Sequence, residues 1–187
     1  MTGPMAPPGT IIMPAEIDAR FGDGSLFKHS AYRLELLDEY DSPKTRIRVA
    51  RFLADQPDDA EVRAYWDRVV GEARRVGKTM QRVHVITEPL TDYLRFELAF
   101  YRGSVLVGED IRLLPGYLAA GLDLPGFDYW LFDDERAAVM YYGDRGTWLH
   151  TEIVTEPSFV ADCCRWRDQA LSRAVPLGDY MAKRSTA

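Results

Sequence analysis

The chain has 187 residues, of which 47% are hydrophobic and 28% are charged, and its formal net charge is −6 at pH 7. These values suit one globular domain with a sizeable core, and the acidic balance argues against a surface that coats nucleic acid with clustered Lys and Arg. No run of about 18 apolar residues is present, so we expect no transmembrane helix. The N-terminus lacks the basic start and long apolar core of a secretory signal.

Residues 1–14 contain four prolines, two glycines and no charged side chain, so we predict a flexible tail ahead of a single domain over 15–180. The first strong pattern comes at residues 30–40, where side chains alternate as they do in a strand. Arg33 and Glu35 would then share the face opposite Tyr32 and Leu34. A helical interpretation of the same run fits nearly as well.

Two amphipathic helices are predicted as an annex over 43–77. The first begins at Pro43, and the second follows the capping spacing from Asp58 to Glu61 and ends at Gly77. Arginines occupy their outer side, which is typical of a solvated face. DNA binding by the second helix is a further alternative, which the net charge disfavours.

The stretch from Arg82 to Arg112 concentrates charge within apolar surroundings. Residues 82–86 alternate and are rich in valine, which predicts a strand, and Glu88-Pro89 then favours the start of a helix. A helical wheel places Glu97 within an apolar stripe, whose members are Leu90, Leu94, Leu98 and Tyr101.

A carboxylate in such a stripe needs a partner, because burying an unpaired charge costs several kcal/mol or forces protonation. The candidate partners of Glu97 are Arg33, Arg82 and Arg112. Asp92 and Arg95 fall on the other helix face with Glu88 and can pair locally.

Beyond this helix the pattern predicts a loop or short strand over 103–108 and a strand over 109–114. A long ordered loop follows over 115–126. Three strands are then predicted, and a last helix begins at Glu156-Pro157. The three strands cover 128–132, 137–142 and 148–154. Residues 181–187 should be frayed. The order predicts the α/β (α+β) class, with a mixed sheet that has helices packed on it.

The two cysteines, Cys163 and Cys164, are neighbours in the last helix. Adjacent helical side chains diverge, so a mutual disulfide would be strained. We interpret them as packed helix residues in a reducing, cytoplasmic compartment. The histidines His29, His84 and His150 are scattered without metal-ligand spacing, so no metal and no cofactor is expected.

Several motifs resemble a known family: RLELLDEY, DYLRFE, GEDIR and YWLFDD. They are similar to an uncharacterised actinobacterial domain-of-unknown-function family of about this length, over roughly 26–177. Genes of that family often lie beside helix-turn-helix regulators, so the resemblance implies a regulatory or accessory role with such a regulator as a partner. The matching positions are Arg33, Glu35, Tyr40, Arg82, Glu88, Asp92, Tyr93, Arg95, Glu97, Gly108, Glu109, Asp110 and Arg112.

The hairpin FDYWLFDDERAAVMYY before a last helix is similar to one half of a phospholipase D-like domain. Active members carry a histidine, a lysine two residues later and an aspartate five residues after that. With Asp133 or Asp134 as the aspartate, those positions hold Gly126 and Asp128, or Phe127 and Tyr129. The resemblance therefore implies a binding or sensor-like member without that chemistry.

The charged residues have two interpretations. They can form a closed ion-pair cluster that fixes the fold, or they can line a pocket whose arginines hold an anion. An arginine left unpaired in a cleft would favour the pocket. The candidate ligand-binding residues are Arg33, Glu35, Arg82, Glu88, Asp92, Tyr93, Arg95, Glu97, Glu109, Asp110 and Arg112.

We therefore expect a non-catalytic, regulatory binding module that recognises a protein partner or a small anionic ligand. The alternative is an enzyme that acts on a phosphorylated or aminoacyl-type substrate. In that case Glu97 or Glu109 would be the base, and Arg82 or Arg112 would hold the anion. DNA and membranes are not expected partners.

Overall fold

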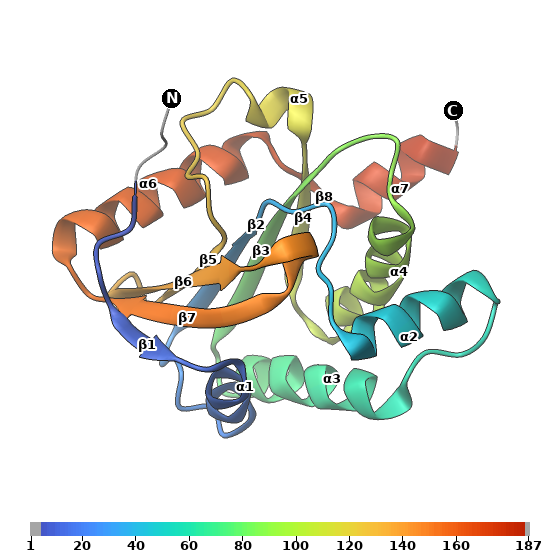
Figure 1. Cartoon of the computed structure of the whole chain (residues 1–187), viewed down its shortest axis with the longest axis horizontal. Helices are drawn as coiled ribbons and strands as arrows, with labels where there is room; N and C mark the ends of the chain where they lie inside the picture. Colours follow the sequence, from blue (N-terminus) through green and yellow to red (C-terminus); the bar gives the residue numbers. More distant parts are fainter. Residues whose placement is uncertain (1–4, 186–187) are drawn as a thin grey trace.

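The computed structural model describes residues 5–185, which form a mixed sheet with helices on both faces (Figure 1). Strands β2 and β3 and strands β3 and β4 pair in parallel, and the other neighbours are antiparallel. This arrangement confirms the predicted α/β class. In order across the sheet the strands are β1 (Thr10–Ile12), β7 (Trp148–Val154), β6 (Arg136–Tyr142), β5 (Tyr129–Phe132), β2 (Ser30–Glu35), β3 (Thr79–Ile86), β4 (Asp110–Pro115) and β8 (Val175–Pro176).

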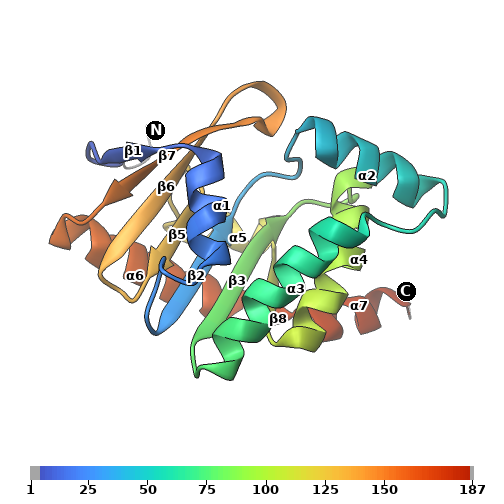
Figure 2. The same cartoon turned by 90° about the horizontal axis from the view of Figure 1, so that it is seen from below.

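Helices cover the two faces unequally, as Figure 2 shows. One face carries α1 (Pro14–Gly22), α3 (Ala60–Arg75) and α4 (Asp92–Val107). The other carries α6 (Pro157–Arg173) and the short α5 (Gly116–Ala119). Two further helices, α2 (Pro43–Leu53) and α7 (Leu177–Ser185), pack against α4. Within residues 5–185, no helix has both the length and the apolar character needed to cross a membrane.

Strand β2 follows the predicted alternation and excludes the helical interpretation. Tyr32 and Leu34 are buried in the cluster beneath α6, so Arg33 and Glu35 point to the face that α1, α3 and α4 cover. A strand that is apolar on one face and charged on the other therefore positions the site described below.

The two ends of the chain are more ordered than their composition predicts. Residues 10–12 pair with β7, and Ile12 is buried, so the predicted tail over 1–14 is wrong for this segment. At the other end α7 extends to Ser185, which corrects the frayed end predicted from residue 181. Both segments gain their order from packing against distant strands or helices, which local composition does not reveal. Residues 1–4 and 186–187 lie outside the described part.

Helix α4 differs from the prediction at both ends. It begins after Thr91, whose hydroxyl accepts a hydrogen bond from the Leu94 amide at 3.1 Å, and not at Pro89. It also continues through 103–107, where a loop or short strand was predicted, and ends at Gly108 with a φ of 118°. Gly103 lies inside the helix, and the Arg63 guanidinium fills the space that a Cβ would take there.

The region after β4 also differs in part. Four residues of the predicted loop over 115–126 form α5. The three strands predicted over 128–154 and the last long helix are confirmed, with Glu156 capping α6 through the amides of Ser158 and Phe159. The aromatic strands thus supply the sheet's second half, beside β2.

Candidate functional site

The site begins with a register match between β2 and β3. Arg33 lies opposite Arg82, and Glu35 lies opposite His84, all on the face that α1, α3 and α4 cover. Two guanidinium groups on neighbouring strands would repel each other unless carboxylates lay between them. The fold therefore requires acidic partners at this position.

Three carboxylates meet this requirement. Glu35 accepts from Arg82 Nη1 at 2.7 Å and lies 3.1 Å from Arg33 Nε. Glu109 accepts from Arg82 Nε at 2.9 Å, and Asp128 lies 3.4 Å from Arg33 Nη2. All five side chains are buried. We call Arg33, Glu35, Arg82, Glu109 and Asp128 the charge cluster.

Neutral donors complete the carboxylates' hydrogen bonds. The Tyr101 hydroxyl donates to Glu35 at 2.8 Å, and the Trp66 indole donates to Glu109 at 2.8 Å. Asp128 accepts from the Leu36 amide at 2.9 Å and from the Tyr40 hydroxyl. Buried polar groups that are bonded this fully hold one geometry and resist rearrangement.

The surroundings shift the pKa values of two carboxyl groups, Glu35 and Asp128, in opposite directions. Burial raises the pKa of Glu35, but the guanidinium groups of Arg82 and Arg33 outweigh it and hold the pKa well below its usual range. At Asp128 burial dominates over the single arginine, Arg33, so its pKa is raised. The cluster thus fixes a charge on Glu35 and leaves Asp128 easier to protonate.

Glu97, which the sequence placed at the centre of the site, is not a member of the cluster. Within residues 5–185 it makes no ion pair with Arg33, Arg82 or Arg112, so the predicted partnership is wrong. Burial and the negative charge of Glu35 raise its pKa to about 7, against an opposing pull from Arg82 and Arg48. Glu35 occupies the position between the arginines that Glu97 was expected to take.

A cleft of about 510 Å³ opens above the charge cluster. Arg33, Glu35 and Arg82 form its floor, and α1, α3 and the chain between β2 and α2 form its walls. Figure 2 shows that chain passing between α1 and α2. The lining side chains include Asp18, Tyr40, Asp41, Trp66, Tyr93, Trp130, Tyr142 and Trp148.

The cleft lies where the sheet changes direction. Glu35 is the last residue of β2, which pairs in parallel with β3 and antiparallel with β5. Ligands of open α/β sheets bind at such carboxyl ends, next to a change in strand order. Both arginines form ion pairs and yet line a cleft, and among the described residues the buried Arg33 Nε has no hydrogen-bond partner. The geometry therefore combines both interpretations considered for the sequence.

Carboxylates outnumber guanidinium groups in the cleft lining and in the charge cluster beneath it. The cluster holds two guanidinium groups against three carboxylates. The walls add Asp18 and Asp41, of which Asp41 lies 3.2 Å from Arg46 Nε. The pKa of Asp18 is raised by burial, with an opposing effect from Lys44. Aromatic rings flank the same space, and the Arg33 guanidinium lies 5.3 Å from the centre of Trp130. The cleft therefore combines a floor of paired charges, carboxylates on its walls and aromatic rings.

The remaining predicted site residues lie elsewhere. Asp92 and Arg95 form the expected local pair, at 3.3 Å, on the exposed side of α4. Asp110 and Arg112 pair with each other at 3.2 Å on β4. Glu88 contacts Tyr180 and Arg184 at a different cavity. Tyr93 alone of these side chains lines the cleft.

Sequence reasoning missed Asp128 and Trp66 as members of the site. Asp128 enters because the hairpin of β5 and β6 pairs beside β2, a contact between segments about a hundred residues apart. An aspartate next to an aromatic strand was the available signal. Trp66 looked like an ordinary core residue of an amphipathic helix, and its indole bond to Glu109 has no sequence signature.

Comparison with known proteins identifies a family for this chain but assigns no activity. No curated protein matches the sequence. A family model described as a domain of unknown function (DUF6879) matches residues 15–182, which confirms the expected resemblance to a domain-of-unknown-function family.

Proposed function

The chain belongs to this family of unknown function, and we propose from its cleft that it is a non-catalytic binding module that takes a positively charged side chain of a partner protein. The observation that carries the proposal is the excess of buried carboxylates over guanidinium groups beneath the cleft floor. A regulatory role follows, because such a module acts by holding its partner.

The sign of the ligand's charge follows from the ion pairs that the arginines already form. Arg33 and Arg82 each contact two carboxylates already. An incoming anion would have to displace one of these buried partners, which leaves an uncompensated charge and costs several kcal/mol. A cation adds an attraction without breaking a pair of the charge cluster. Of the two expected ligand classes, a protein partner therefore fits better than a small anion.

The aromatic side chains in the cleft walls also favour a cationic ligand over an anion. Trp66, Trp130, Tyr142 and Trp148 line the cleft, and a guanidinium or ammonium group is attracted to the face of such rings. The cleft thus offers a cation the carboxylates of Glu35, Asp18 and Asp41 together with ring faces.

Exposed apolar side chains near the cleft favour a protein over a free small molecule. Met13 precedes the lining residue Pro14 and is 56% exposed, and Ile47 lies on α2 beyond the lining residue Thr45 and is 61% exposed. Exposed apolar groups around a polar centre are typical of protein interfaces. A helix-turn-helix regulator, rich in arginine for phosphate contacts, is the partner that the family resemblance suggests.

Two further expectations belong to this proposal. The two free cysteines suit a reducing cytoplasm. The resemblance to one half of a phospholipase D-like domain also suits a binding role, because Gly126 and Asp128 stand where active members carry histidine and lysine.

A titration with the peptide acetyl-Gly-Arg-Gly-amide tests the proposal, with calorimetry or NMR as the readout. The peptide should bind saturably, and Asp41→Asn should weaken it about threefold to tenfold, because the wall loses a carboxylate. Asp123→Asn is the matched control: it removes the same charge from an exposed loop residue outside the cleft lining. Absence of binding to the parent protein, or equal loss in both variants, would refute the proposal.

An enzymatic role is the second candidate, and one observation favours it. The pKa of Glu97 is raised to about 7, which suits a general base near neutral pH. Its carboxylate does not belong to the cleft lining, whereas Tyr93 one turn earlier does. Turnover of phosphorylated or aminoacyl-type substrates that disappears in a folded Glu97→Gln variant would establish this alternative in place of the binding module.

A further inference from the structure

His84 lies on β3 beside the charge cluster and has no part in the function proposed above. Its side chain is fully buried, and it lies opposite Glu35 in the register of β2 with β3. A buried histidine is ordinarily neutral, because burial disfavours the charged form. The hydrogen bonds of His84 indicate the opposite.

Both ring nitrogens of His84 have an oxygen partner. Nε2 lies 2.9 Å from the carbonyl oxygen of Leu37, and a carbonyl oxygen only accepts, so Nε2 carries a hydrogen. Nδ1 lies 3.0 Å from the Tyr101 hydroxyl, which in turn lies 2.8 Å from Oε2 of Glu35. The hydroxyl has a single hydrogen to donate to these two neighbours.

Only the doubly protonated ring satisfies every one of these contacts. If Nδ1 carried no hydrogen, the Tyr101 hydroxyl would leave either Nδ1 or Glu35 facing an oxygen lone pair, at 3.0 or 2.8 Å. If Nδ1 carries a hydrogen, it donates to Tyr101, and Tyr101 donates to Glu35. Glu35 remains an acceptor, because Arg82 and Arg33 outweigh burial and hold its pKa well below its usual range.

The charge balance of the cluster favours the same state. Two guanidinium groups face three carboxylates, so the charge cluster by itself carries one negative charge in excess. Asp128 accepts from an amide and from two hydroxyl groups, as an ionised carboxylate does. The His84 imidazolium supplies the missing positive charge, with Nδ1 3.8 Å from Glu35. Buried charges persist when they are paired and hydrogen-bonded in this way.

Six titratable or charged side chains act on His84 or on its partner Tyr101: Glu35 on β2, Tyr40 on the chain that follows, Arg82 on the same strand, and Tyr93, Glu97 and Tyr101 itself on α4. Burial raises the pKa of each tyrosine well above its usual range. Of the six, only Glu97, whose pKa burial raises to about 7, titrates near neutral pH. An experiment on His84 must therefore separate it from Glu97.

We propose that His84 and Tyr101 form a proton-linked switch that regulates the cleft. In the free protein both ring nitrogens of His84 carry hydrogen, and the imidazolium balances the charge cluster. When a cation binds beside Glu35, which lines the cleft, Nδ1 releases its proton to solvent and the Tyr101 hydroxyl turns from Glu35 to Nδ1. Oε2 of Glu35 then accepts from the incoming guanidinium. The regulation rests on the proposed function, whereas the protonated ring of the free protein does not.

The direction of the pH dependence follows from linkage. Because binding releases a proton, the affinity for a cation rises with pH, by at most about tenfold per pH unit. The rise ends where His84 is already neutral in the free protein.

Nitrogen NMR of the His84 ring in the full chain tests the first step, at about pH 7. Both ring nitrogens should carry hydrogen in the free protein. Saturation with acetyl-Gly-Arg-Gly-amide should convert the ring to the form with hydrogen on Nε2 alone. A free protein whose Nδ1 carries no hydrogen would overturn the switch, even if the peptide binds.

Calorimetry with the same peptide between about pH 6 and about pH 8 tests the linkage. The parent protein should bind about tenfold more tightly at the upper end. Glu97→Gln removes the other group that titrates in this range and should keep the rise, whereas His84→Gln should abolish it. The exposed His29 gives the matched control, because His29→Gln should behave like the parent. If His84→Gln does not fold, the NMR spectrum of the peptide complex decides the question in the parent protein.

The outcomes separate the switch from the proposed function. A peptide that binds with equal affinity across the pH range leaves the proposed function in place and overturns the switch. A rise that disappears in Glu97→Gln and persists in His84→Gln assigns the effect to Glu97 and also overturns it. Absence of peptide binding at every pH would refute the proposed function, and the switch with it.

Discussion

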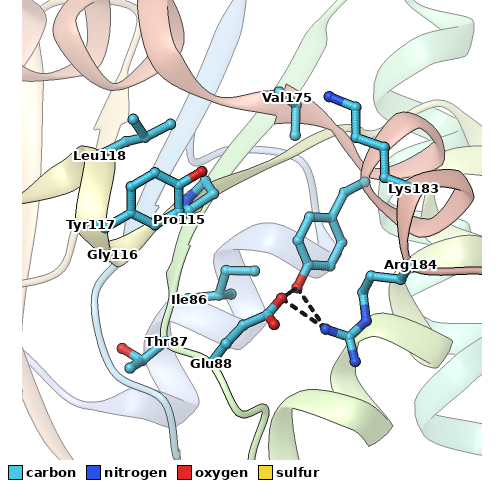
Figure 3. Close-up of a pocket in the computed structure, with 11 residues that line it drawn as sticks. Ile86, Thr87, Glu88, Pro115, Gly116, Tyr117, Leu118, Val175, Lys183 and Arg184 are labelled. Atoms are coloured by element: carbon cyan, nitrogen blue, oxygen red, sulfur yellow. Dashed lines mark hydrogen bonds and ion pairs between the residues drawn. The ribbon is translucent and has the colours of Figure 1, made fainter. Parts of the chain in front are cut away.

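The cleft and a second cavity, which helices α5 and α7 border beside Glu88 (Figure 3), occupy the same kind of place and differ in how their charges are held. Both lie at the carboxyl ends of parallel strands. Beneath the cleft, buried arginines and carboxylates each have several partners, whereas at the second cavity Arg184 and Glu88 are 41% and 55% exposed and have few. Charges of the first kind stabilise the fold and, in the proposed function, select the charge of the ligand, while charges of the second kind can change without disturbing the fold.

The largest effect should follow from removing Glu35, which lies between Arg33 and Arg82. Glu35→Ala removes the carboxylate that both buried guanidinium groups share, so the two like charges face each other across neighbouring strands. We expect a loss of roughly 3 to 5 kcal/mol in the free energy of unfolding, measured in urea. A loss below about 1 kcal/mol would mean that the cluster is open to solvent and would remove the contrast between the two regions.

Substitution of Glu97 should have an intermediate effect on the free energy of unfolding, and this effect should depend on pH. The folded pKa of Glu97, about 7, is raised above the ordinary value of 4.5 for glutamate. Its contribution to stability is therefore complete below the unfolded pKa and is lost as pH rises through about 7. Glu97→Gln mimics the protonated form, so the variant should gain roughly 1 to 3 kcal/mol over the parent at about pH 8 and little at about pH 4.

Unfolding free energies of both proteins across this pH range check the prediction. Glu35, Arg82, Arg48 and Tyr93 act on Glu97 in the folded protein and are unchanged in the variant. The difference between the two curves therefore isolates Glu97. A difference that is flat with pH would show that Glu97 titrates as an ordinary surface carboxylate.

The smallest effect should come from the exposed pair on α4. Asp92 and Arg95 are both 58% exposed, and such pairs contribute little because solvent and salt screen them. Asp92→Ala should change the free energy of unfolding by less than about 0.5 kcal/mol. Comparison with Glu35→Ala in the same buffer then measures how far burial separates the two kinds of charge.

The predictions from sequence were correct where the pattern within a single strand or helix determined the result. Alternation along β2 placed Arg33 and Glu35 on one face, and the apolar-charged pattern singled out Arg82 and Glu109. They failed at contacts between distant segments. Glu97 fits the apolar stripe of α4 as well as any acid would, and only the register of β2 against β3 shows that Glu35 reaches the arginines first.

The same limit explains the other differences. Asp128 joins the charge cluster through the pairing of β5 with β2, and β1 forms only because β7 is there to pair with it. Neither pairing leaves a local pattern in the sequence. The aromatic strands were predicted correctly, because their β-branched and ring-bearing side chains carry their own preference.

A head-to-head titration with two peptides tests the central claim most directly. Acetyl-Gly-Arg-Gly-amide and the same peptide with citrulline differ by one charge and hardly at all in shape. If the carboxylate excess beneath the cleft governs recognition, the arginine peptide should bind at least about tenfold more tightly, and added salt should narrow the gap. Equal affinities, or preference for the neutral peptide, would contradict the account.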